Sequence, residues 1–297
     1  MLDNLEKQFI IVGDVQLHVV MAGNPEGEPI VLLHGFPEFW YGWRNQIPYL
    51  VEKGYRVIIP DQRGYNLSDK PKGVSSYKLD ILAQDVVNLA DALGYEKINL
   101  VGHDWGAIVA WWVASLFPNR LTKLGILNVP HPSVMINQWS KGNISQWLKS
   151  WYIGFFQLPF IPETLVSLGD YSVFEQAIRQ SGHPNTFTDD DIEAYRRAWS
   201  QPNAVTSMVN WYRAIARSGM DSSLRKKHRI IVPTLMLWGE QDKFLGKELA
   251  KPSIDLCLDG ELVYFPNATH WIQHDASEAV NEELHRFFSE PVAELNP

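Results

Sequence analysis

The sequence predicts an α/β fold in which a mostly parallel central sheet is flanked by helices and carries an inserted helical segment. Short apolar runs of strand length alternate with helical patterns up to residue 127, which is typical of a parallel sheet covered on both faces. From about residue 131 to 228 no strand-like run occurs, and aromatic helical segments take its place. Strand patterns then return. We therefore expect a core domain, 1–130 and 229–297, and a helical insertion, 131–228.

The first elements are a hairpin and two buried strands. Alternating apolar residues on both sides of Gly13 and Asp14 predict a β-hairpin, 9–12 with 15–21. Residues 29–34 and 55–59 are short, continuous apolar runs, as in strands that are buried on both faces. Residues 40–51, between them, have the pattern of a helix.

The later elements continue the alternation. Apolar residues at helical spacing predict a helix at 77–93, which Gly94 ends. The remaining patterns are strands at 98–102, 121–127, 230–232, 235–239 and 261–265, helices at 107–117 and 277–288, and helices of the insertion at 174–179, 189–199 and 205–217. Ligands bind at the carboxyl ends of the strands in such sheets, so Phe36, Asp104, Asp242 and His270 should meet at one edge.

Composition excludes several classes of function. The chain has 297 residues, of which 45% are hydrophobic, enough for a sizeable core. Its net charge of −8 argues against a nucleic-acid partner. The longest apolar run, 107–117, is too short to span a bilayer, and the first residues lack the apolar region of a signal peptide. Cys257 is the single cysteine, which fits a reducing compartment, so we expect a cytoplasmic protein with no membrane span. The oligomeric state stays open.

Asp104 is the residue around which the other candidates are arranged. It follows an apolar strand, precedes a helix, and lies between Gly102 and Gly106. This frame is that of a nucleophile elbow, where glycines let the strand and the helix approach closely around a strained central residue. Serine is the usual central residue. A helix-capping role for Asp104 is the structural alternative.

An aspartate at this position restricts the chemistry. A carboxylate that attacks a saturated carbon forms an ester, which an activated water can then hydrolyse, whereas a serine would form a stable ether. Asp104 therefore predicts hydrolysis at a saturated carbon, of an epoxide or an alkyl halide. This chemistry needs no metal or organic cofactor, and we expect none.

The base and its partner are expected after the last two strands. His270 follows strand 261–265 and can activate the water, and Asp242 follows strand 235–239 and can orient His270. The order of nucleophile, acid and base is the one expected for this architecture. Glu240 is an alternative to Asp242, and His103 and His274 are alternatives to His270.

The oxyanion that forms on Asp104 needs backbone donors. The N–H groups of Phe36 and Trp105 are the candidates for this oxyanion hole, since Pro37 has no N–H. A cis peptide before Pro37 is possible, which sequence does not decide. The chain has 12 tryptophans, and several lie beside these positions, which suggests an aromatic pocket for an apolar substrate. The candidate pocket residues are Pro37, Trp105, Trp151, Phe155 and Trp271.

These residues together resemble the epoxide hydrolases of the α/β-hydrolase superfamily over essentially the whole chain. The matching motifs are His34-Gly35-Phe36-Pro37-Glu38, Gly102-His103-Asp104-Trp105-Gly106, Asp242 and His270-Trp271, with the helical insertion as the family's cap. The resemblance implies an apolar epoxide and water as substrates. It also implies two cap tyrosines, Tyr152 and Tyr212, that hydrogen-bond the epoxide oxygen, a role that suits a phenol because the leaving alkoxide is very basic.

Two other functions compete with this one. The first is a haloalkane or haloacid dehalogenase that uses the same aspartate. It is disfavoured because Phe36 stands where haloalkane enzymes usually carry Asn, and no arginine lies between residues 64 and 119 to hold a haloacid carboxylate. The second is a non-catalytic binding protein on this fold, which would have no need for the full set of nucleophile, acid, base and tyrosines.

Overall fold

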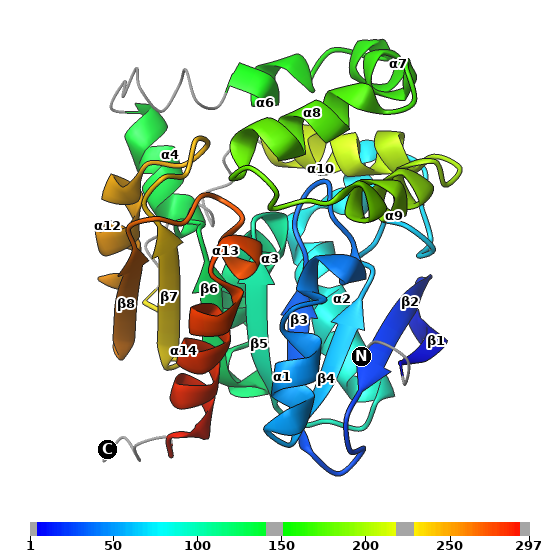
Figure 1. Ribbon diagram of the computed structural model, residues 1–297. Coiled ribbons are helices and arrows are strands. Elements are labelled where there is room, and N and C mark those ends of the chain that lie inside the picture. Colours follow the sequence, from blue (N-terminus) through cyan, green and yellow to red (C-terminus); the bar gives the residue numbers. More distant parts are fainter. Residues whose placement is uncertain (1–4, 141–150, 218–228, 292–297) are drawn as a thin grey trace.

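An eight-stranded sheet forms the centre of the molecule (Figure 1). The computed structural model describes residues 5–140, 151–217 and 229–291. The strand order is β1-β2-β4-β3-β5-β6-β7-β8. The pairs β1–β2 and β2–β4 are antiparallel, and the other five pairs are parallel. The strands are β1 Glu6–Val12, β2 Val15–Ala22, β3 Glu28–Leu33, β4 Tyr55–Pro60, β5 Ile98–His103, β6 Leu121–Leu127, β7 Thr234–Gly239 and β8 Gly260–Phe265. The predicted mostly parallel sheet is confirmed.

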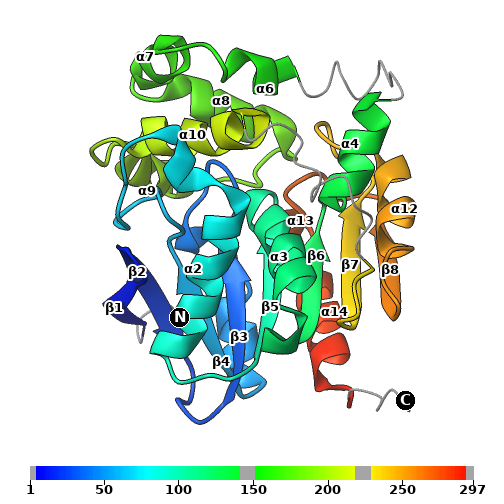
Figure 2. The ribbon, with the colours of Figure 1, turned by 180° about the vertical axis from the view of Figure 1, so that it is seen from behind.

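Helices cover both faces of the sheet. On one face lie α1 (Ile47–Glu52) and α14 (Ser277–Ser289), and on the other lie α2 (Leu79–Ala92) and α3 (Trp105–Leu116), as the opposite views show (Figure 1, Figure 2). α12 (Ala250–Ile254) packs beside β7 and β8, and α13 (Ile272–Asp275) precedes α14. Strands β3 to β6 are almost wholly buried, so the core lies on both sides of the central strands.

The regular elements among the described residues between β6 and β7 are all helices. These are α4 (Pro132–Ser140), α6 (Trp151–Phe155), α7 (Ile161–Ser167), α8 (Ser172–Ser181), α9 (Asp189–Trp199) and α10 (Ala204–Arg217). Helices α6 to α10 lie above the carboxyl ends of the strands in both views (Figure 1, Figure 2). The predicted helical insertion is thus present, while its expected end at residue 228 lies outside the described residues. No helix in the described ranges combines the length and the apolar character needed to cross a membrane.

Two predicted elements differ from the structure. Residues 40–51 do not form one helix, because Pro48 lacks an N–H and its ring would clash with the carbonyl four residues before it. A 3-10 turn, Trp40–Trp43, comes first, and α1 then begins with Pro48 in its first turn. Residues 230–232 do not form a strand. Ile230 makes an isolated bridge with Cys257, and β7 begins only after Pro233.

Candidate active site

Asp104 lies in the sharp turn from β5 to α3. Its backbone is strained, with φ of 50° and ψ of −123°. The flanking glycines are required, since a Cβ on Gly102 would lie 2.4 Å from the Gly106 oxygen, and one on Gly106 would lie 2.2 Å from the Leu33 oxygen. Asp104 occupies the N-cap position of α3, but its side chain makes no capping hydrogen bond. The capping alternative is therefore wrong, and the carboxylate is free to face the other strand ends.

Three further strand-end residues surround this carboxylate. The Phe36 amide donates to Asp104 Oδ1 at 2.7 Å. His270 Nε2 lies 3.4 Å from Asp104 Oδ2, and His270 Nδ1 lies 2.7 Å from Asp242 Oδ2. The structure thus brings Phe36, Asp104, Asp242 and His270 together at one edge of the sheet, as the strand patterns predict.

Burial and charge set the protonation of this group. Burial alone would lower the pKa of His270, but the Asp242 carboxylate and the contact with Asp104 together raise the pKa of His270 to about 10. Burial would likewise raise the pKa of the Asp104 carboxyl, and the contact with His270 outweighs it and keeps that pKa below its usual range. His270 and Asp104 therefore form an ion pair at neutral pH.

The two candidate oxyanion donors differ in their contacts. The Phe36 amide already bonds Asp104, and the Phe36-Pro37 peptide is cis. A side chain at Gly35 would collide with Asp104, because its Cβ would lie 2.3 Å from the Asp104 Cβ. The Trp105 amide lies in the first turn of α3, and it makes no hydrogen bond to Asp104 among the described residues.

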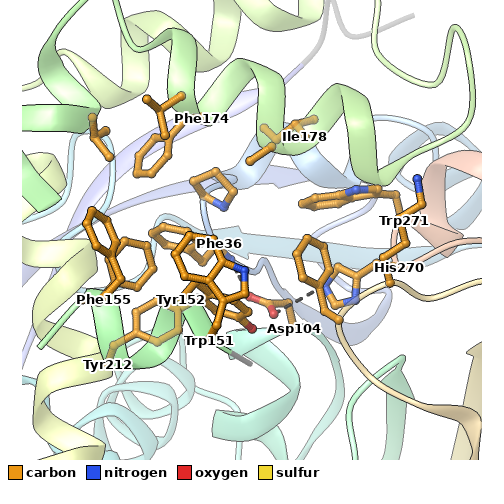
Figure 3. Close-up of a pocket in the computed structure, with 17 residues that line it drawn as sticks. Phe36, Asp104, Trp151, Tyr152, Phe155, Phe174, Ile178, Tyr212, His270 and Trp271 are labelled. Carbon is orange, nitrogen blue, oxygen red and sulfur yellow. Dashed lines mark hydrogen bonds and ion pairs between the residues drawn. The ribbon is translucent and has the colours of Figure 1, made fainter. Parts of the chain in front are cut away.

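A cavity of about 490 Å³ opens in front of Asp104 (Figure 3). Its walls are mainly aromatic. Of the residues proposed for the pocket, Pro37, Trp151, Phe155 and Trp271 line this cavity and Trp105 does not. The Trp105 ring is buried beneath Tyr212, with the ring centroids 4.9 Å apart. The lining residues that sequence reasoning missed are Phe156, Val166, Val173, Phe174, Ala177, Ile178, Lys243 and Phe244.

Tyr152 and Tyr212 line the cavity from two helices of the insertion, α6 and α10. Their ring centroids are 5.9 Å apart. They lie to one side of Asp104, and His270 lies to the other (Figure 3). Burial and the negative charge of Asp104 raise the pKa of both phenols, so both stay protonated and can donate hydrogen bonds.

The alternative acid and bases are engaged elsewhere. Glu240 pairs with Lys247 at 2.5 Å. His274 bonds the buried Glu38 carboxylate at 2.8 Å, and His103 Nε2 donates to the backbone oxygen of His270 at 2.8 Å. Burial alone would raise the pKa of Glu38, but His274 and His103 hold it well below its usual range. Sequence reasoning missed this buried group, because the pattern gives no sign that Glu38 would face the two histidines.

The chain has extensive similarity to known proteins. The model of the alpha/beta hydrolase fold family matches residues 28–277. The chain is 47% identical over 281 residues to the AB hydrolase superfamily protein YfhM of Bacillus subtilis, covering 95% of this chain and 97% of that protein. It is 38% identical over 286 residues to epoxide hydrolase 4 of Homo sapiens, covering 93% and 76% respectively.

A solved structure shares the architecture. It is a variant of an epoxide hydrolase from Bacillus megaterium in complex with its product, (R)-3-[1]naphthyloxy-propane-1,2-diol. The two structures agree with a TM-score of 0.84 at 30% sequence identity, and the match covers 95% of this chain and 100% of that one.

Proposed function

Because this chain belongs to the α/β-hydrolase family and its relatives include epoxide hydrolases, we propose that it hydrolyses epoxides to vicinal diols through an ester on Asp104. The observation that carries this proposal is the arrangement of one cavity: a paired carboxylate on one wall and two protonated tyrosines beside it. Opening an epoxide requires both a nucleophile and a proton donor for the ring oxygen. The mainly aromatic lining favours aryl or alkyl epoxides.

In the first step Asp104 attacks one carbon of the epoxide. The bond between that carbon and the ring oxygen breaks, and Tyr152 and Tyr212 donate hydrogen bonds to the oxygen as its negative charge develops. The oxygen takes a proton from one tyrosine. The raised pKa of that tyrosine makes it recover a proton at once, which His270 supplies through solvent, leaving His270 neutral.

In the second step a water molecule hydrolyses the ester. Neutral His270, oriented by Asp242, removes a proton from the water, and the resulting hydroxide attacks the Asp104 carbonyl carbon. The Phe36 and Trp105 amides stabilise the oxyanion. Collapse expels the diol oxygen, which takes a proton from His270. The Asp104 acid then returns a proton to His270, which restores the ion pair.

The insertion, 131–228, acts as a cap in this scheme, since its described helices supply both tyrosines.

The proposed location is the cytoplasm, because a chain with a single cysteine fits a reducing compartment.

Conversion of styrene oxide, a chloroalkane and fluoroacetate by the wild type and by the double variant Tyr152→Phe and Tyr212→Phe tests the proposal. We expect diol from the wild type, no halide release, and a loss of roughly 10²- to 10⁴-fold in the double variant, the range for a general acid. Val173→Ala, which changes the cavity wall without a polar group, is the control. Halide release that survives loss of both tyrosines would instead show a dehalogenase.

The structure gives a specific reason to rank the dehalogenase second. In haloalkane enzymes the tryptophan after the aspartate donates to the halide, and the corresponding residue here, Trp105, does not line the described cavity. A haloacid carboxylate would need an arginine, and Lys243 is the only Lys or Arg among the residues that line it. A non-catalytic binding protein would give neither diol nor halide.

A further inference from the structure

Asn128 lies directly after β6, at the same sheet edge as the candidate active site. It is fully buried, and its backbone has φ of 57°, a left-handed conformation that Asn adopts more readily than most residues. The N–H of Asn128 donates to the Leu237 oxygen at 3.0 Å, which continues the pairing of β6 with β7. Like Asp242, Asn128 is a polar residue just beyond the end of a buried strand.

The side-chain amide of Asn128 joins three segments of the site. Its oxygen accepts the N–H of Gly239, the last residue of β7, at 2.7 Å. Its nitrogen donates to Asp242 Oδ2 at 2.8 Å and to the backbone oxygen of Thr269 at 3.2 Å. Thr269 immediately precedes His270. One amide therefore contacts both the carboxylate that orients His270 and the chain that carries His270.

Asn128 bonds the same carboxylate oxygen of Asp242 that His270 bonds. Asp242 Oδ2 accepts from both Asn128 and His270, the latter at 2.7 Å. Asp242 Oδ1 accepts from the backbone amides of Phe244 and Leu245 at 2.7 and 2.9 Å. With two backbone donors on Oδ1, the Asn128 amide helps to fix the position of Oδ2 toward His270.

We propose that Asn128 is a positioning residue for the ester-hydrolysis step, acting through Asp242 and the Thr269 carbonyl on His270. The inference rests on the proposed function. Asn128 does not line the described cavity, so it does not touch the substrate. Asp104 and the tyrosines form the ester in the first step, and His270 only returns a proton to the tyrosine once the ester has formed, whereas in the second step His270 is the base. Loss of the Asn128 amide should therefore slow the second step and spare the first.

Single turnovers of styrene oxide, with the protein in excess, separate the two steps. Acid quenching followed by intact-protein mass spectrometry reports the ester, and chromatography reports the diol. Asn128→Gly removes the amide and tolerates the left-handed backbone. We expect its ester formation to stay within about twofold of wild type while ester hydrolysis slows by roughly ten- to a hundredfold, as for the loss of a hydrogen bond to a charged group. Asn128→Ser, which keeps a small polar side chain, is measured beside it in case the glycine variant does not fold.

Asn66 provides a matched control. It is also a buried asparagine with positive φ, 40°, and its amide donates to a buried carboxylate, Asp61 Oδ2, at 2.7 Å. Asn66→Gly should keep the wild-type ratio of the two rates. Equal losses in both steps, an unchanged ester-hydrolysis rate in the Asn128 variants, or the same selective loss in Asn66→Gly would overturn the inference. A wild type that forms neither ester nor diol would instead contradict the proposed function.

Discussion

The charge on His270 depends on the state of Asp104. In the resting protein both Asp242 and Asp104 favour the charged imidazolium, and the pKa of His270 is about 10. Ester formation turns Asp104 into a neutral group. One of the two carboxylates that raise the pKa of His270 is then lost, so this pKa falls. The same residue can thus pair with the nucleophile before the first step and act as a base in the second.

This dependence predicts how the two steps respond to pH. The pKa of Asp104 is lowered, so Asp104 stays ionised and ester formation continues in mild acid. Ester hydrolysis needs neutral His270, whose fraction grows as pH rises, so this step should quicken with pH until the pKa of His270 in the ester is passed.

The ester fraction at steady state is the measurement. On quenching at about pH 5.5, below the ordinary pKa of histidine, most of the protein should carry the ester, and at about pH 8.5 little of it should. His270→Gln should hold the ester at both pH values. An ester fraction in the wild type that does not change with pH would contradict this role of His270.

At the scale of elements, helix α9 is attached to the segment that carries the Phe36 amide. Asp191, Tyr195 and Trp199 are spaced four residues apart and so lie on one face of α9. Asp191 pairs with Arg44 at 3.0 Å, the Tyr195 hydroxyl donates to Glu38 at 2.5 Å, and the Trp199 indole donates to the Pro37 oxygen at 2.6 Å. The position of one helix of the insertion is therefore coupled to the proposed oxyanion hole.

Trp199→Phe tests this coupling. The change keeps an aromatic ring but removes the hydrogen bond to Pro37, next to Phe36, so we expect turnover to fall by roughly tenfold through misplacement of the Phe36 amide. The free energy of unfolding should fall by about 1 kcal/mol, the usual contribution of one hydrogen bond. Turnover and denaturant unfolding are the measurements.

The control for this variant is Trp111→Phe. The Trp111 indole also donates to a backbone oxygen, that of Val129, at 3.2 Å, and it is also fully buried. Its loss should cost similar stability without the drop in turnover. Equal turnover in the two variants would argue that α9 does not position Phe36.

The periodicity of the sequence predicts most elements of the fold because each strand and helix must bury an apolar face. It overestimates helix 40–51, where Pro48 prevents continuation, and strand 230–232, where Pro233 removes a donor and Ile231 faces solvent. In both cases the apolar spacing is that of the predicted element, but a proline prevents the backbone hydrogen bonds that the element needs.

The candidate site is predictable to the extent that it lies at strand ends. Asp104 and Asp242 follow the buried strands β5 and β7, His270 follows the edge strand β8, and the parallel sheet brings the three together. Trp105 lies on α3, and only the rotation of that helix and the packing of Tyr212 decide that its ring faces away from the cavity. Phe156 and Phe174 were missed because their orientation depends on how the helices of the insertion pack, and Phe244 was missed because it lies in a loop after β7 with no regular pattern.

At the scale of the whole molecule, the candidate site is divided between two parts of the chain. The sheet supplies Asp104 and His270, and the helices above it supply Tyr152 and Tyr212 (Figure 1). The cavity between them is mainly aromatic. Neither part alone contains both a nucleophile and the donors for the leaving oxygen.

The central claim is that an ester on Asp104 precedes the diol, and isotope labelling tests it most directly. A single turnover of styrene oxide in heavy-oxygen water, with the protein in excess, is analysed for label in the diol and in the peptide that contains Asp104. If Asp104 is the nucleophile, the diol receives an oxygen from its carboxylate, so the diol is unlabelled and the peptide gains the heavy oxygen. Label in the diol at the first turnover, with none in the peptide, would show direct attack of water on the epoxide and contradict the account.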